Sequence, residues 1–121
     1  MKTSTVGFVA EGIAAKFLQD QQYVILDHNW RRPWGEIDII AKKGSKIIFV
    51  EVKASRTQSS TFAPEIRADW QKMQKVIRTA RTYLLANKYS PEQEWQIDVI
   101  SVNFDQKQDK ALIKHFRNME F

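Results

Sequence analysis

The segment GEIDIIAKKGSKIIFVEVK, residues 35–53, is the feature that most constrains how this chain can fold. Two runs of β-forming residues flank Gly44-Ser45, and a glycine in the first position of a two-residue loop favours a type II′ turn between antiparallel strands. We therefore predict strands over residues 36–41 and 46–54. Both runs are largely apolar, which indicates burial on both faces, yet carboxylates interrupt each of them.

The turn sets the register of this hairpin. A two-residue loop pairs Lys43 with Lys46, which places Asp38 directly opposite Glu51 and Glu36 opposite Lys53. A four-residue loop with the same centre keeps this register, whereas a three-residue loop shifts it by one residue. Side-chain alternation also places Glu36, Asp38 and Ile40 on one face of their strand, and Ile37, Ile39 and Ala41 on the other.

The predicted opposition of Asp38 and Glu51 needs a physical explanation. Directly opposed residues have Cβ atoms about 4.5–5.5 Å apart, and like charges at that distance destabilise the pair. A divalent cation removes the repulsion, and Mg²⁺ or Mn²⁺ prefers carboxylate oxygens and retains several waters. Such an ion can activate a water and stabilise charge on a phosphate. The alternative is a solvent-facing hairpin with cross-strand salt bridges, which suits Glu36 with Lys53 but not Asp38 with Glu51.

Lys53 shares the face of Glu51, two residues further along the same strand. Its ammonium group is predicted to orient the attacking water or to stabilise the charge that develops on the phosphate.

The remaining periodic segments predict the element order α-β-β-β-α-β-β, a mixed sheet with helices in an α/β protein. They are helices over 5–21 and 64–87 and strands over 23–30, 95–103 and 111–116, with a bend at 31–35 and a polar loop at 55–63. This order differs from the strict β-α alternation of a doubly wound fold. We see no linker or repeat, and 121 residues suit one domain, 1–121.

Basic residues outnumber acidic ones, and the net charge of +5 suits a polyanionic partner. A basic ridge steps by three along the second helix: Lys72, Lys75, Arg78 and Arg81. Such a ridge can contact phosphates without reading sequence, although a solvated helix face explains most of these residues equally well.

The run WRRPW, residues 30–34, places two tryptophans around two arginines directly before the hairpin. Arginine can clamp a phosphate, and tryptophan can stack on an unpaired base. We predict Arg31 and Arg32 as nucleic-acid contacts. The tryptophans have two interpretations of equal weight, which are base stacking and cover for the core.

Several classes of protein and site are disfavoured. The chain has no cysteine, so disulfides and thiolate metal sites are excluded. Its apolar runs are too short to span a membrane, and the N-terminal residues lack the pattern of a signal peptide, so we expect a cytoplasmic protein. His28, His115 and Asp98 lie on predicted strands and are expected to be structural.

Asp38 followed by Glu51-Val52-Lys53 resembles the motif of the PD-(D/E)xK nuclease superfamily. The fuller string GEIDIIA…FVEVK is similar to the YraN-like family of predicted endonucleases, which is related to archaeal Holliday junction resolvases. The resemblance extends to Glu11, Asn29, Arg31 and Lys72. It implies a restriction-endonuclease-like sheet, a divalent metal at the acids, a DNA substrate that includes branched DNA, and, by analogy with resolvases, a homodimer.

The resemblance has departures that concern substrate contacts. Ala10 stands where glycine is usual, Gln96 where a basic residue is common, and Ser55 where arginine is frequent, with Arg56 as a substitute. Glu11 lies at the edge of the first helix's apolar stripe, and the resemblance makes it a third metal ligand or a holder of metal-bound water. Its alternative is an ordinary boundary glutamate.

The sequence therefore predicts a Mg²⁺- or Mn²⁺-dependent endodeoxyribonuclease. Asp38 and Glu51 are the predicted metal ligands, Glu11 supports them, and Lys53 assists the water. Glu36 is a structural or supporting neighbour. The predicted DNA contacts are Arg31, Arg32, Lys72, Lys75 and Arg56. Two other classes stay open, which are a non-catalytic nucleic-acid-binding module with the same fold and an adaptor domain that binds protein.

Overall fold

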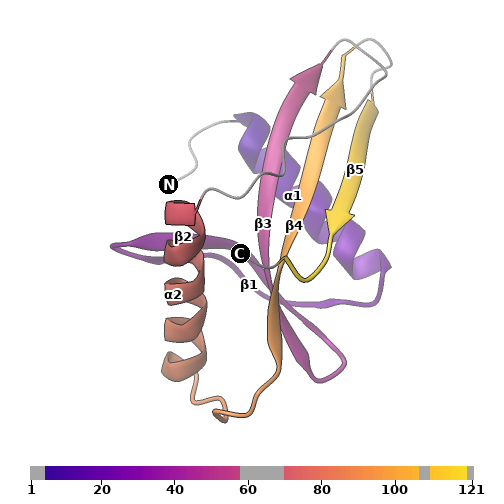
Figure 1. The fold of residues 1–121 in the computed structure, drawn as a ribbon. Helices are drawn as coiled ribbons and strands as arrows, with labels where there is room; N and C mark the ends of the chain where they lie inside the picture. Colours follow the sequence, from indigo (N-terminus) through magenta and orange to yellow (C-terminus); the bar gives the residue numbers. More distant parts are fainter. Residues whose placement is uncertain (1–4, 58–69, 107–109, 120–121) are drawn as a thin grey trace.

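The computed structural model describes residues 5–57, 70–106 and 110–119, and it confirms the predicted α/β class and element order (Figure 1). The elements are α1 (Thr5–Asp20), β1 (Val24–Arg32), β2 (Gly35–Lys43), β3 (Lys46–Thr57), α2 (Trp70–Ala86), β4 (Trp95–Asp105) and β5 (Lys110–Phe116). The five strands form one restriction-endonuclease-like mixed sheet in the order β1-β2-β3-β4-β5. Only the β3–β4 pair is parallel.

The two helices cover opposite faces of this sheet (Figure 1). Helix α1 packs with Ala10, Ala14 and Leu18, all fully buried, and the two alanines allow its backbone to approach the strands closely. Helix α2 packs against β2, with Met73 and Val76 in a second core. Each strand in the middle of the sheet is therefore buried on both faces, as its apolar sequence predicts.

The turn of the hairpin confirms the predicted register over its first part. Gly44 has a φ of 61°, and the pairing runs as predicted from Lys43 opposite Lys46 to Ile39 opposite Val50. The ladder ends there, so the predicted direct opposition of Asp38 with Glu51 is wrong, and so is that of Glu36 with Lys53. The physical reason is that β2 remains paired with β1 as far as Gly35, whereas β3 remains paired with β4 as far as Thr57, and the two pairs diverge (Figure 1).

The predicted alternation of faces also fails where the ladder ends. Ile39 and Ala41 pack in the core under α1, but Ile37 packs with Ile40 in the core under α2. A strictly alternating strand would have placed Ile37 with Ile39. This local change of direction lies at Asp38, and it determines which acids can meet.

The element boundaries differ modestly from those predicted. β1 continues to Arg32 and β2 begins at Gly35, so the bend is reduced to Pro33 and Trp34. The second helix is seen as Trp70–Ala86, and its predicted first residues, 64–69, lie outside the described part of the chain, as does most of the predicted loop at 55–63. Among the described residues, no helix is both long and apolar enough to cross a membrane.

Candidate metal centre

Three carboxylates meet where α1 crosses β2. They belong to Glu11, Glu36 and Asp38, and one oxygen of each lies within 4.8 Å of the others. Glu11 is only 7% exposed and Asp38 only 3%, so water screens their charges poorly. Because like charges in a buried cluster repel strongly, this arrangement favours a bound cation or hydrogen-bond donors between the acids.

Asn29 of β1 supplies such a donor. Its Nδ2 donates to Oε1 of Glu11 at 2.9 Å and lies 3.4 Å from Oε2 of Glu36, so that one amide joins the helix acid to the strand acid. The backbone of Asn29 has a φ of 48°, in the left-handed region that asparagine adopts more readily than most residues. A strained conformation in the middle of a strand is typical of functional sites, and here it directs the amide at the cluster.

Arg31 contacts the other carboxylate oxygen of Glu36. The two residues are directly opposed in the β1–β2 ladder, and Nε of Arg31 lies 2.6 Å from Oε1 of Glu36. The arginine side chain is 44% exposed, so the ion pair adds little stability and mainly directs the carboxylate. The structure thus places Arg31, predicted as a DNA contact, next to a carboxylate of the cluster.

Asp38 is anchored at the end of the ladder. Its Oδ2 accepts a hydrogen bond from the backbone N–H of Val52 at 2.8 Å, in a buried position. The carboxylate thereby replaces the strand carbonyl that would have received this N–H had β2 continued alongside β3. This bond holds Asp38 in place between the acid cluster and β3.

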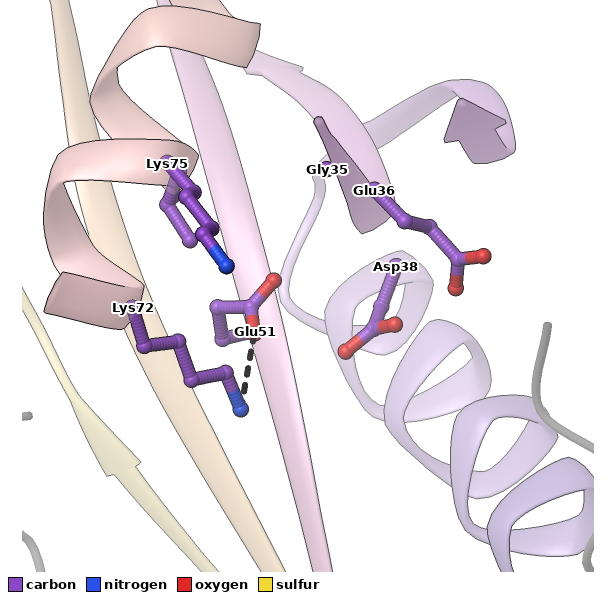
Figure 2. A pocket seen from close by; sticks show the side chains of 7 residues that line it. Gly35, Glu36, Asp38, Glu51, Lys72 and Lys75 are labelled. Carbon is purple, nitrogen blue, oxygen red and sulfur yellow. Dashed lines mark ion pairs between the residues drawn. The ribbon is translucent and has the colours of Figure 1, made fainter. Parts of the chain in front are cut away.

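A pocket of about 310 Å³ opens beside the cluster, and Figure 2 shows the side chains that line it. The lining residues are Gly35, Glu36, Asp38, Glu51, Lys72, Lys75 and Val76. Lys72 and Lys75 project from the first turns of α2 towards Glu51 of β3, and Nζ of Lys72 lies 3.6 Å from Oε2 of Glu51 (Figure 2). Glu51 therefore shares the pocket with Asp38 although it is not directly opposite that residue.

The donor set fits a hard divalent cation. Three carboxylates supply only oxygen ligands, which Mg²⁺ and Mn²⁺ prefer, and the adjoining pocket leaves room for the waters that Mg²⁺ retains. The lysines on the far side of the pocket complement a phosphate. The arrangement can therefore hold a cation beside a bound phosphate group.

Lys53 and Arg56 lie apart from this pocket and from the acid cluster. Lys53 is half-buried on β3 beside Ser101, and it is not among the described side chains that line the pocket. Arg56 is exposed and lines a different hollow with Val9 and Phe104, next to α1. Alternation along β3 explains this position, because residue 56 points to the face opposite that of residue 51.

Sequence reasoning missed two contributors to the site. Glu36 was assigned a structural or supporting role, but its carboxylate belongs to the cluster. Asn29 received no role, although asparagine is disfavoured in strands and its presence in a β-rich run is a signal of a special backbone or contact. Arg32 lies at the end of β1, with its guanidinium over the ring of Trp30.

Asp98 and His115, which the sequence shows as separate strand residues, are bonded to each other. Nε2 of His115 lies 2.7 Å from Oδ2 of Asp98, and both side chains are buried. Burial by itself would raise the pKa of Asp98, but hydrogen bonds from His115, from the backbone N–H of Asn118 and from Gln96 outweigh it. They hold the pKa below the ordinary value of 3.8. The pair therefore joins β5 to β4, and the N–H of Asn118 joins the segment after β5 to the same carboxylate.

Comparison with known proteins gives one consistent result. The model of the Uncharacterised protein family UPF0102 matches residues 10–102, which include all four acids of the cluster and pocket. A UPF0102 protein of Campylobacter fetus subsp. fetus is 37% identical over 121 residues, covering 100% of this chain and 98% of its own.

Two further relatives agree with this. A UPF0102 protein of Fervidobacterium nodosum is 39% identical over 115 residues, covering 92% of this chain and 78% of its own. A UPF0102 protein of Thermotoga maritima is 44% identical over 79 residues, covering 65% of this chain and 70% of its own. The chain therefore belongs to the UPF0102 family, which confirms the resemblance to the YraN-like proteins.

Proposed function

We propose that this protein is a divalent-metal-dependent endonuclease that hydrolyses DNA phosphodiester bonds. The observation that supports this most strongly is the convergence of the carboxylates of Glu11, Glu36 and Asp38 beside a pocket lined by two lysines. Carboxylates on one side and ammonium groups on the other match the two requirements of phosphodiester hydrolysis, which are a cation site and phosphate recognition.

Asp38, Glu11 and Glu36 would hold Mg²⁺ or Mn²⁺. When bound, the ion supplies an activated water and stabilises negative charge on the phosphate. Asp38 is kept in position by the N–H of Val52, and the amide of Asn29 orients Glu11 and Glu36. These contacts keep the ligand oxygens arranged before substrate binds, which avoids reorganisation during the reaction.

Lys72 and Lys75 would bind the phosphate that is to be cleaved. Both line the pocket, and Lys72 is half-exposed, so its ammonium group can move from Glu51 to a phosphate oxygen. In this arrangement Glu51 would accept a proton from the attacking water or complete the ligand set. The role of Lys53 in orienting the water stays a prediction.

The substrate proposal is DNA, including branched DNA such as a Holliday junction. The net charge of +5 and the basic ridge along α2 support a polyanionic substrate. The resemblance to resolvases suggests that this substrate is branched DNA. The homodimer and the phosphate contact of Arg56 likewise stay predictions.

A cleavage assay tests the proposal. Linear, single-stranded, flapped and four-way-junction DNA would be incubated with the protein in Mg²⁺ or Mn²⁺, beside Asp38→Asn. Asp20→Asn is the matched control, because Asp20 is an exposed acid on α1 that pairs with Lys16 outside the cluster. We expect cleavage by the wild type and Asp20→Asn and none by Asp38→Asn.

Two results would separate the proposal from its alternatives. DNA binding without cleavage, equal in the wild type and Asp38→Asn, would favour the non-catalytic nucleic-acid-binding module. Absence of any salt-sensitive DNA binding would favour the adaptor domain. Calorimetric titration with Mn²⁺ adds a readout independent of turnover, and we expect binding to the wild type but not to Asp38→Asn.

A further inference from the structure

Two arginines lie over the rings of tryptophans. Cζ of Arg78 lies 4.0 Å from the ring centroid of Trp34, and Cζ of Arg32 lies 3.7 Å from that of Trp30. At these distances the guanidinium is attracted by the ring, and the contact restricts its orientation. Arg32 is further held by a hydrogen bond from its Nη1 to the carbonyl oxygen of Arg31, at 2.7 Å.

The Arg78–Trp34 pair adjoins the pocket on both of its chain segments. Arg78 follows Lys75 by three residues on α2, and side chains at this spacing are neighbours on a helix surface. Trp34 directly precedes Gly35, and both Lys75 and Gly35 line the pocket. The two segments are in close contact here, because a Cβ on Gly35 would lie 2.7 Å from Oγ1 of Thr79.

The stacking determines what these residues can recognise. A guanidinium that lies over an indole keeps its N–H edges available, and its planar fork suits a phosphate with two oxygens facing it. The indole face under the arginine, in contrast, is covered. The ring of Tyr83 also packs nearly perpendicular to that of Trp30, with ring centroids 5.2 Å apart. Neither tryptophan therefore presents a fully open ring to a base.

We infer that Arg78, supported by Trp34, is a phosphate-binding residue for a double-stranded arm of the substrate, with Lys75 three residues before it on the same helix. This rests on the proposed function and specifies its substrate class. Proteins that hold single strands rely on bases stacked on open aromatic rings, whereas a duplex offers its phosphates and keeps its bases stacked inside. The covered tryptophans match the duplex.

Fluorescence anisotropy in EDTA tests this inference, because it measures binding without cleavage. A labelled duplex and a single strand of the same length would be titrated with the wild type, Arg78→Gln and Arg81→Gln. Arg81 is the matched control, since it is an exposed arginine one turn further along the same helix. We expect Arg78→Gln to weaken duplex binding and to make the slope of log K against log salt shallower by about 0.9, and Arg81→Gln to change both much less.

Trp34→Leu provides a second test in the same assay. It removes the ring beneath Arg78 and keeps the arginine, so we expect weaker duplex binding with little change for the single strand. Loss of single-strand binding alone would mean that Trp34 stacks on bases, and equal effects of Arg78→Gln and Arg81→Gln would mean diffuse charge attraction. Either result overturns the inference. Thermal melts that match the wild type would show that Arg78→Gln remains folded.

The inference and the nuclease proposal can fail separately. A wild type that cleaves DNA in Mg²⁺ while Arg78→Gln binds duplex normally would overturn the phosphate site and leave the nuclease. A wild type that binds duplex through Arg78 but never cleaves would support the phosphate site and overturn the nuclease.

Discussion

Replacing Asn29 with glycine isolates the hydrogen bonds that hold the acid cluster. Asn29 has a φ of 48°, which glycine adopts without strain, so Asn29→Gly removes the side-chain amide and preserves the backbone. The change deletes the 2.9 Å bond to Glu11 and the longer 3.4 Å contact with Glu36. Without them, less of the repulsion between the two carboxylates is offset in the metal-free protein, although Arg31 still pairs with Glu36.

The expected loss of stability follows from these two contacts. A hydrogen bond to a charged group contributes about 1.5–3 kcal/mol, and the contact at 3.4 Å adds little because it is long for an N–H···O bond. We therefore assign about 2 kcal/mol to the amide. The greater freedom of glycine in the unfolded chain adds roughly 0.5–1 kcal/mol, and release of the strain that asparagine carries at this φ offsets that cost. A loss of about 2 kcal/mol corresponds to a decrease in Tm of roughly 8 °C for a domain of this size.

Urea denaturation in EDTA measures this loss, and Asn118→Gly is the matched control. Asn118 also has a left-handed backbone, with a φ of 52°, and its contact with Asp98 uses the backbone N–H, which glycine retains. Calorimetry should also show that Asn29→Gly lowers Mn²⁺ affinity about 10- to 100-fold, as loss of a residue that orients metal ligands does. Equal destabilisation by the two glycine variants, together with unchanged Mn²⁺ affinity, would refute this reasoning.

Three further predictions concern the site and its supports. Asp38→Ala should lower the free energy of unfolding by about 1–3 kcal/mol, because it removes the carboxylate that accepts the buried N–H of Val52. Asp38→Asn keeps an oxygen acceptor at this position and should cost far less in urea denaturation. Gly35→Ala should cost about 1–3 kcal/mol, because its Cβ meets Thr79, and adding Thr79→Ala should recover most of the loss in the same assay. The folded pKa of Asp98 lies below 3.8, so the folded state binds fewer protons than the unfolded chain and gains stability as pH rises. The stability difference between the wild type and Asp98→Asn should therefore shrink as pH falls below about 3.8, and a constant difference would contradict the assignment.

Much of the fold follows from local sequence signals. Gly44 adopts the left-handed conformation that its turn requires, and the first part of the β2–β3 register follows from that turn alone. The apolar runs of β2 and β3 are buried on both faces, and the helical periods correspond to α1 and α2. These features could be predicted because near neighbours along the chain determine backbone conformation, side-chain period and hairpin register.

The membership of the acid cluster depended on tertiary structure. The register argument placed Asp38 opposite Glu51, but a ladder carries register only as far as the strands stay paired, and this one ends at Ile39. Glu11 meets Asp38 because α1 packs across the sheet, at a position that depends on how both apolar surfaces fill space.

The sequence by itself therefore determined the order of the elements, the hairpin turn and the presence of acids in buried strands. The tertiary structure decided that Glu36 joins Glu11 and Asp38. It also decided that the amide of Asn29 lies between Glu11 and Glu36 and contacts both. It also placed Arg56 on the opposite face from the pocket. The physical reason is that these contacts join segments far apart in the chain, and their distances depend on strand divergence and helix packing rather than on local preference.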